Sequence, residues 1–356
     1  ISLVGITLSL VAILVGQMLE GGHVGSLLQF TAFMIVIGGT LGAVMLQSSL
    51  KVFLDGLSML RWVFQPPRVA SQETLDMILD WSQKARRGGL LAGVALFALF
   101  LLGAALAPLL APHDPWRHFA PFLSPSAIHM LGTDDVGRDI LSELVTGARV
   151  SLTEGLLSGF LAVAIGVLVG LVAGFRRGRL DELLMGLTDV VLVIPALPLV
   201  ILVSVYLGAG IWHTILVIGL VFWPSTARVI RSQVLTVRQS GYVEAARALG
   251  AGDAWLMRRH VLPNVMPLVL AKLVLTIAAA MLMEASLSFL GLGDPTAKSW
   301  GMMLHYAFAR GGFIRELWWW YLPPGLCISL CIFSLSLISF GIEERSDPRL
   351  RRALDR

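Results

Sequence analysis

The residues with the clearest chemical potential lie in a polar stretch between two long apolar runs, at 231–263. Tyr242 to Leu249 can form a short helix that Gly250 ends, because glycine adopts the left-handed cap conformation at little cost. Asp253 is placed to cap a second short helix, Ala254 to His260, and Pro263 is expected to end it and to open the next apolar segment. Two short helices joined at an angle would form a rigid projection that fits a groove on a partner. A surface hairpin without a partner is the alternative.

Patterns typical of enzymes are missing from the sequence. The string closest to a nucleotide-binding loop is Gly291 to Ser299, but Ala297 stands where glycine is needed before Lys298 for the backbone to wrap phosphates. Cys327 and Cys331 lie four residues apart in an apolar run, which indicates packing thiols on one helix face. Three histidines share one loop without ligand spacing, so we interpret them as polar surface groups and predict no metal site. They are His113, His118 and His129.

The composition is that of a polytopic integral membrane protein. Of 356 residues, 56% are apolar and only 14% are charged, and the mean hydropathy of +0.80 is far above that of a soluble domain. The 27 Lys and Arg residues form clusters between apolar runs and no single basic face. This pattern predicts contact with membrane lipid and no nucleic-acid partner.

The fold class predicted from the apolar runs is all-α. Runs of about 20 apolar residues can span a bilayer as helices, and the chain has roughly eight of them. They cover approximately 2–19, 30–48, 90–110, 151–174, 186–208, 211–230, 264–290 and 322–342. Small residues four apart, such as Gly166, Gly170 and Gly174 in one run or Gly38 and Gly42 in another, favour close helix packing in lipid.

Orientation is predicted from the basic residues, which concentrate in alternate connections. Those connections are 51–87, 176–179, 228–259 and 345–356. The positive-inside rule therefore places both termini and the 231–263 loop in the cytoplasm. Trp318 to Tyr321 precede the last run and suggest an aromatic belt on the outer face.

The segment 61–88 differs in character from the runs around it. Pro66 and Pro67 end one helix, and Ser71 to Trp81 is typical of an amphipathic cytoplasmic helix. The string Arg86 to Gly89 is expected to break that helix, which places a module boundary near 88–91.

Several motifs follow one another in order from about residue 91 onward. The 231–263 stretch contains Glu244, Ala245, Ala246, Gly250, Asp253, His260, Leu262 and Pro263, and an earlier loop contains Gly132, Thr133, Asp134, Asp135, Gly137, Arg138 and Asp139. Further strings are 147–152, 183–189 with Pro195, 284–293 and 347–350. The first set resembles the coupling signature of ABC importer permeases, and together the motifs resemble the C-type permeases of the dipeptide, oligopeptide and nickel ABC importer family.

The first 90 residues carry different motifs, which are Gln17 to His23, Gly38 to Gly42, and Leu60 to Phe64 followed by Pro66 and Pro67. These strings resemble the opening of the flagellar motor stator A subunit. A natural fusion, an erroneous joining of two genes and a deliberately joined chain all account for this mosaic. We favour the last two over a functional fusion, because half a stator subunit lacks the ion path and the rotor contacts of that family. The runner-up function, a stator-type proton channel subunit, rests on this segment alone.

The permease resemblance implies a fold, an organisation and partners. It implies a type I ABC importer permease fold with two extra N-terminal membrane helices, in a bacterial inner membrane. The expected parts are a stator-like segment 1–89, a first permease span with an outer loop 90–150, a transmembrane core 151–345 and a tail 346–356. The implied partners are a second permease, two ATPase subunits that bind ATP and Mg²⁺, and an extracytoplasmic binding protein. No cofactor is expected on this chain, and no catalytic residue.

Three polar residues inside the apolar runs are candidates for the path or for packing. Asp189 and Glu284 are intramembrane carboxylates, which are functional suspects or helix-to-helix hydrogen-bond partners. Lys272 departs from the family pattern. We expect its long side chain to snorkel to the cytoplasmic surface, with a charged path lining as the alternative.

Overall fold

The computed structural model describes residues 72–346, with side chains described for 89–343. The predicted spans 2–19 and 30–48, and the tail beyond 346, lie outside the described residues. By contacts the chain divides into a unit 1–80 and a unit 81–356, and the second is described below.

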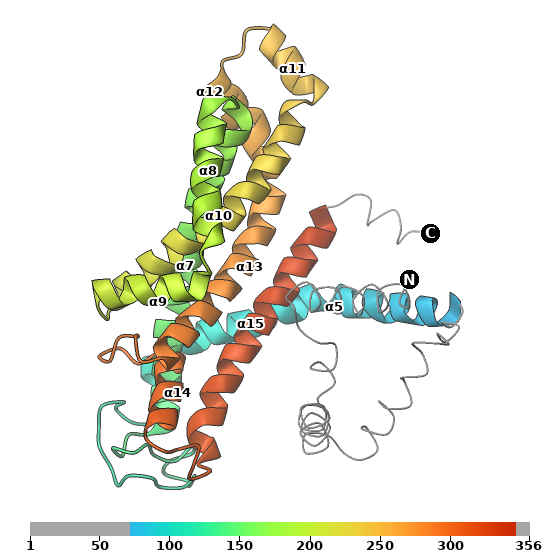
Figure 1. Ribbon diagram of the computed structural model, residues 1–356. Helices are drawn as coiled ribbons and strands as arrows, with labels where there is room; N and C mark the ends of the chain where they lie inside the picture. The colour runs from blue at the N-terminus through green and yellow to red at the C-terminus, as the bar shows by residue number, and fades with distance from the viewer. Residues whose placement is uncertain (1–71, 347–356) are drawn as a thin grey trace, which may run out of the picture. The chain divides into compact units, whose positions relative to one another are not determined.

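Helices account for all regular structure among residues 72–346, apart from one isolated bridge between Thr133 and Asp139. In chain order they are α5 (Gln72–Ala105), α6 (Ala107–Leu110), α7 (Ile140–Arg176), α8 (Arg179–Val193), α9 (Ala196–Leu207), α10 (Ile211–Arg238), α11 (Gly241–Ala248), α12 (Asp253–Leu256), the π-helical turn η4 (Met257–Val261), α13 (Leu262–Phe289), α14 (Trp300–Ala309) and α15 (Trp318–Ser346). Figure 1 shows their arrangement.

Four of these helical stretches are long and apolar enough to cross a membrane. They are Ile140–Arg176, Ile211–Arg238, Asp253–Phe289 and Trp318–Glu343. The helices α8 and α9 pass the same test as a pair, but the chain bends by 90° between them, and Gly89–Ala105 is a shorter apolar helix. The all-α fold is therefore confirmed. The spans predicted from 90 onward are confirmed too, apart from 90–110, where the described helix Gly89–Ala105 is shorter than a span, and one further exception.

The further exception is the run 186–208, which was predicted as a single span. It is broken at Ile194 and Pro195, because proline has no N–H to donate and forces the preceding residue into an extended conformation. A second correction concerns Arg86 to Gly89, where α5 continues without the predicted break. Glycine weakens a helix by only about 1 kcal/mol, so two glycines beside good helix formers do not end it.

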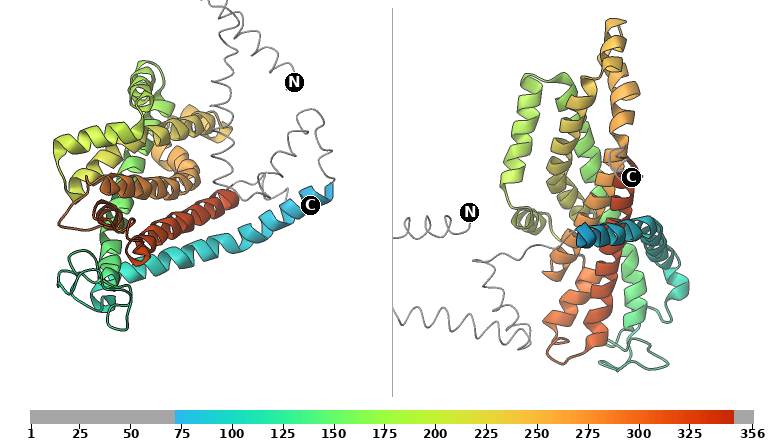
Figure 2. Two further views of the ribbon diagram at one scale, coloured as in Figure 1. Left: turned by 60° about the horizontal axis from the view of Figure 1, so that its bottom comes forward. Right: turned by 90° about the vertical axis from the view of Figure 1, so that its right-hand side faces the viewer.

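Helix α7 packs most closely against α10 through its glycines. A Cβ at Gly170 would lie 2.5 Å from the Ala227 carbonyl oxygen, and one at Gly174 would lie 2.9 Å from that of Arg231. The predicted packing role of this stripe is confirmed. Gly93 of α5 makes the same kind of approach to α15, at the Ser334 carbonyl oxygen (2.8 Å), and Figure 2 shows the two helices side by side.

Aromatic residues at the start of α15 depart from the predicted belt. Only Trp318 is strongly exposed, whereas Trp320 is 1% exposed and packs in the core with Trp300, Ile140 and Met281. Burial removes more apolar area from water here than an interfacial position would.

The helical body carries functional candidates at its two opposite ends (Figure 1). One end holds α11, α12 and η4, which we call the hairpin end (residues 239–261). The other holds the loop 111–139, the loop 290–299 and α14, which we call the network end.

Candidate functional sites at the hairpin end and the network end

At the hairpin end, α11 is closed by a left-handed glycine cap. Gly250 has φ +89°. Its N–H donates to the Arg247 carbonyl (3.0 Å), and the N–H of Ala251 donates to the Ala246 carbonyl (3.1 Å). These two bonds make a Schellman motif, which satisfies carbonyls that would otherwise lack a partner at the helix end. The predicted helix with its glycine terminator is confirmed.

The hairpin rests on a buried apolar seat. Val243, Leu256 and Val261 are fully buried and cluster with Phe175, the last aromatic residue of α7. The guanidinium groups of Arg238 and Arg247 each lie 5.5 Å from the centre of the Phe175 ring. A cation over an aromatic face adds about 0.5–1 kcal/mol at an exposed site. The hairpin is thus fastened to both α7 and α10.

The opposite face of the hairpin is open. Glu244, Ala245 and Trp255 are exposed, and Leu249 is 90% exposed. Beside them lies an open concavity lined by Ala246, Leu249, Gly250, Ala251, Gly252 and Trp255. The His260 ring lies between Tyr242 of α11 and Trp255 of α12, with ring centres 5.9 and 5.0 Å away. A rigid unit with a large exposed apolar residue has the properties of a docking surface.

Two local predictions for the second short helix are wrong. Asp253 is the first residue of α12 and not its cap: the N-cap is Gly252, and no side-chain cap hydrogen bond is formed. Pro263 does not end the helix either, because η4 joins α12 to α13 without interruption and Leu262 donates to the Met257 carbonyl. The wider π-turn shifts the hydrogen-bond register just before Pro263, whose missing N–H is tolerated in the first turn of α13.

At the network end, the outer-loop motif folds into a tight structure. Gly132 and Gly137 have φ of +70° and +83°. A Cβ at Gly137 would lie 2.0 Å from the Phe119 carbonyl oxygen. Asp134 accepts the backbone N–H groups of Val136 (3.0 Å) and Arg138 (2.7 Å).

Three further motif residues bond outside this turn. Thr133 donates to the Ala120 carbonyl (2.8 Å), and Asp139 caps α7 by accepting from the N–H of Ser142 (2.9 Å). Asp135 forms an ion pair with Arg310, and that hydrogen bond raises the pKa of Arg310 above its ordinary value against the opposing effect of burial.

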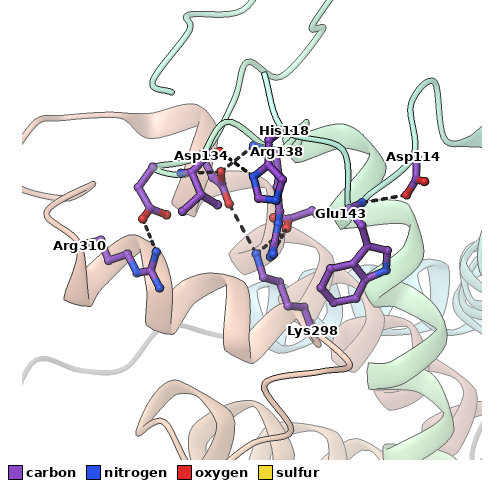
Figure 3. A network of polar contacts seen from close by, with 10 residues as sticks. Asp114, His118, Asp134, Arg138, Glu143, Lys298 and Arg310 are labelled. Carbon is purple, nitrogen blue, oxygen red and sulfur yellow. Dashed lines mark hydrogen bonds and ion pairs between the residues drawn. The ribbon is translucent and has the colours of Figure 1, made fainter. Parts of the chain in front are cut away.

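A buried ion network joins this loop to residues far away in sequence (Figure 3). Lys298 Nζ lies 2.5 Å from Glu143 Oε1 and 3.5 Å from Asp134 Oδ2, and Arg138 adds a 3.6 Å contact with Glu143. The Glu143 and Asp134 side chains are 4% and 1% exposed. No spacing rule could have found Lys298, because its partners lie 155 and 164 residues away.

A histidine pair in the same loop sits close to a carboxylate. His113, His129 and Asp139 offer ligand atoms that all lie within 4.8 Å of one another. His129 Nδ1 is 2.9 Å from Asp139 Oδ1, and His113 Nε2 is 3.0 Å from the Ile128 carbonyl oxygen. His129 is buried, so its interpretation as a surface group is wrong. His118 is exposed and bonds to the Val136 carbonyl.

Between the two ends, the three intramembrane candidates have different surroundings. Glu284 is buried and accepts from Ser288 (2.8 Å), and Glu154 of α7 is also buried. Glu154 was missed, although a carboxylate inside an apolar run is itself a signal. Lys272 is half-buried, and no ion pair to it is found among the described side chains. Asp189 is exposed and pairs with Arg228 at 2.6 Å.

These observations together define a class of protein. A body of helices that can cross a membrane, with a rigid hairpin exposed at one end and a tied loop at the other, is that of a multi-pass membrane protein. Residues 166–352 match the sequence profile of the binding-protein-dependent transport system inner membrane component family.

Individual relatives extend this match over most of the chain. The di/tripeptide transport system permease protein of Pseudomonas aeruginosa is 39% identical over 282 residues, which are 77% of this chain and 92% of the relative. The dipeptide transport system permease protein of Bacillus subtilis is 34% identical, over 76% and 85% of the two chains. The oligopeptide transport system permease protein of the same organism is 34% identical, over 79% and 93%. A chain of the MetNI methionine ABC transporter, solved in inward-facing conformations, aligns with TM-score 0.47 and 20% identity, covering 60% of this chain and 97% of that one.

The chain therefore belongs to the binding-protein-dependent transport system inner membrane component family. It is a membrane-spanning permease subunit of an ABC importer in the inner membrane. Residues 3–89 match a second profile, the motility protein A N-terminal family, which confirms the resemblance of that segment. The proton-channel alternative is not favoured, because the motility match ends at 89 whereas the permease relatives account for about three quarters of the chain.

Proposed function

We propose that this permease moves di- or oligopeptides, or related small solutes, into the cell by ATP-driven alternating access. It pairs with a second, related permease. Two separate ATPase subunits bind and hydrolyse Mg-ATP, and an extracytoplasmic binding protein delivers the solute. Dipeptides, longer peptides, nickel chelates and glutathione-like compounds all remain within this substrate class. The names of the relatives, which are peptide permeases, support the choice.

In this proposal the hairpin end faces the cytoplasm and receives the ATPase. The observation that carries the assignment is the contrast between its two faces: Val243 and Leu256 are seated in the core, whereas Glu244 and Leu249 are exposed. A projection seated in this way moves with α7, α10 and α13 as one body, so a push on it would reach the membrane helices. Basic residues around it, Arg238, Arg258 and Arg259 among them, support the cytoplasmic orientation.

The test compares two glycines of the hairpin that differ only in backbone conformation. Among the described residues, nothing beyond the chain neighbours lies within 4 Å of a Cβ added at Gly250 or Gly252, but only Gly250 has positive φ. Gly250→Val should strain the Schellman motif by about 1–3 kcal/mol and tilt the docking face. Gly252→Val keeps an extended backbone that valine adopts readily.

The measurement is peptide uptake and ATP hydrolysis by the whole complex in proteoliposomes. We expect Gly250→Val to insert and assemble while the number of ATP molecules hydrolysed per peptide rises several-fold. Gly252→Val loses only the N-cap preference of glycine over valine at α12, about 1 kcal/mol, and should therefore stay much closer to the wild type. Normal coupling in the Gly250 variant would remove the hairpin from this role, and a wild-type complex without an ATPase partner would remove the transport proposal itself.

A further inference from the structure

Two Asp–Arg pairs join α8 to α10, and they differ sharply in their surroundings. Asp181 accepts two hydrogen bonds from Arg231, from Nε (2.6 Å) and Nη2 (2.7 Å), and its side chain is 12% exposed. Asp189 makes one bond with Arg228 (2.6 Å), and the two side chains are 62% and 58% exposed. The first pair already clamps the helices, and an exposed pair adds at most about 1 kcal/mol. Helix attachment therefore does not account for the second pair.

The second pair lies among apolar residues and close to a break in the helix. Its neighbours on α8, Val190 and Val193, are exposed apolar residues typical of a membrane-crossing segment. Asp189 also lies about one turn before the end of α8, where the chain bends by 90°. Charged groups at such depth face water or a partner and not lipid, and interrupted membrane helices mark solute sites in many transporters.

Polar residues continue from the pair along one face of α10. Ser225, Arg228, Ser232 and Thr236 are all exposed and follow each other at three- and four-residue spacing, so they lie on one side of the helix. Within the part of the chain that the structure describes, the hydroxyls of Ser225 and Thr236 donate to carbonyls of their own helix, at Phe222 and Ser232. Ser225 lies in the predicted span 211–230, whereas Ser232 and Thr236 lie in the connection predicted to be cytoplasmic, so the stripe leads from the apolar segment toward the cytoplasmic side. This position favours a water-filled path over lipid contact.

We propose that this α10 face and Asp189 line the translocation path, and that the Asp189–Arg228 pair opens to hold a solute with free amino and carboxylate ends. The ammonium group exchanges onto Asp189 and the carboxylate onto Arg228, where a guanidinium can accept it in bidentate geometry. Each charge keeps an opposite partner throughout, so neither is left unpaired when the solute enters or leaves. This inference rests on the proposed transport of peptides, and it names the residues that would recognise the peptide termini.

The first experiment tests water access and does not depend on the solute. In a chain with Cys327 and Cys331 replaced by Ala, Ser225→Cys and Leu220→Cys are compared within the assembled complex, since both positions are exposed on α10. A membrane-impermeant thiol reagent should modify Ser225→Cys in at least one nucleotide state and leave Leu220→Cys unmodified. If the Ser225 variant is as unreactive as the Leu220 variant in both the ATP-bound and nucleotide-free states, the face does not line the path.

The second experiment tests recognition by uptake of dialanine into proteoliposomes. Asp189→Asn should raise the KM for dialanine by roughly tenfold, because it removes a charged hydrogen bond. The same variant should leave the KM for N-acetyl-dialanine, which has no ammonium group, nearly unchanged. The matched control is Asp181→Asn, which should lower thermal stability and shift both KM values equally.

A charge exchange separates this role from a structural one. Asp189→Arg combined with Arg228→Asp restores an ion pair, so assembly should be normal while dialanine uptake stays impaired. Restored uptake would show that only the pairing matters and would overturn the inference. Loss of the second permease from the Asp189→Asn complex would overturn it as well, since the face would then be the contact between permeases. Dialanine uptake that is absent even from the wild type would count against the proposed substrate class, whereas the thiol experiment would still decide the path.

Discussion

The two ends of the helical body are held by different forces. At the network end, charged side chains are buried: Lys298, Glu143 and Asp134 are each at most 11% exposed, and every one has an opposite charge beside it. At the hairpin end, apolar residues form the seat, and the charged Glu244 points to solvent. A buried charge destabilises the fold strongly when its partner is removed, whereas an exposed ion pair contributes little to the free energy of folding. Mutations at the network end should therefore change mainly the stability of the chain. Mutations at the hairpin end should change mainly the binding of partner subunits.

The largest effect is expected from Lys298→Met at the network end. The change leaves Glu143 and Asp134 buried, with Arg138, which contacts Glu143, as their one remaining ion-pair partner among the described residues. Removing one partner of a buried ion network typically costs about 3–5 kcal/mol, and the remaining arginine places this case at the lower limit. Thermal unfolding of the purified chain in detergent, followed by tryptophan fluorescence, should show a clear drop in Tm.

The control for this prediction removes a charge of each sign. Lys298→Met combined with Glu143→Gln should recover part of the lost stability, since fewer buried carboxylates lack a cation. An unchanged Tm in the single variant would mean that water solvates these charges in the folded chain, and the comparison between the ends would lose its basis.

A smaller effect is expected from Phe175→Leu at the hairpin end. Leucine keeps most of the apolar contact with Val243 and Leu256 but removes the ring face under Arg238 and Arg247. Two cation–π contacts of about 0.5–1 kcal/mol each would be lost. The free energy of unfolding should fall modestly. Hydrogen exchange of the α11 amides should accelerate, because the hairpin would open without global unfolding. Equal protection of α11 in both proteins would show that the apolar seat alone holds the hairpin.

Sequence alone predicted the hairpin end better than the network end, for a physical reason. Helix α11 and its Gly250 cap depend on neighbours within five residues, so the local pattern suffices. The roles given to Asp253 and Pro263 failed because Leu256 and Val261 are drawn into the core, which keeps the chain helical through η4. Lys298 meets Glu143 only in the folded chain. The bend at Pro195 was missed because apolarity and length report that a run can span a membrane and not that it is straight.

The smallest effect on folding, and the sharpest test of the comparison, is expected from Leu249→Ser. Leu249 is 90% exposed next to the Gly250 cap, so the free energy of unfolding should change by less than about 0.5 kcal/mol. The same change removes the most exposed apolar side chain from the proposed docking face, and a side chain that fills a pocket at the centre of an interface can contribute about 2 kcal/mol. Binding of the ATPase subunits to the permease pair, measured by surface-immobilised titration, should weaken at least tenfold. Ile314→Ser supplies the control, since Ile314 is 88% exposed near the network end and should alter neither quantity. If Leu249→Ser instead destabilised the permease and left ATPase binding intact, the hairpin end would serve stability and not partner binding, which contradicts the comparison.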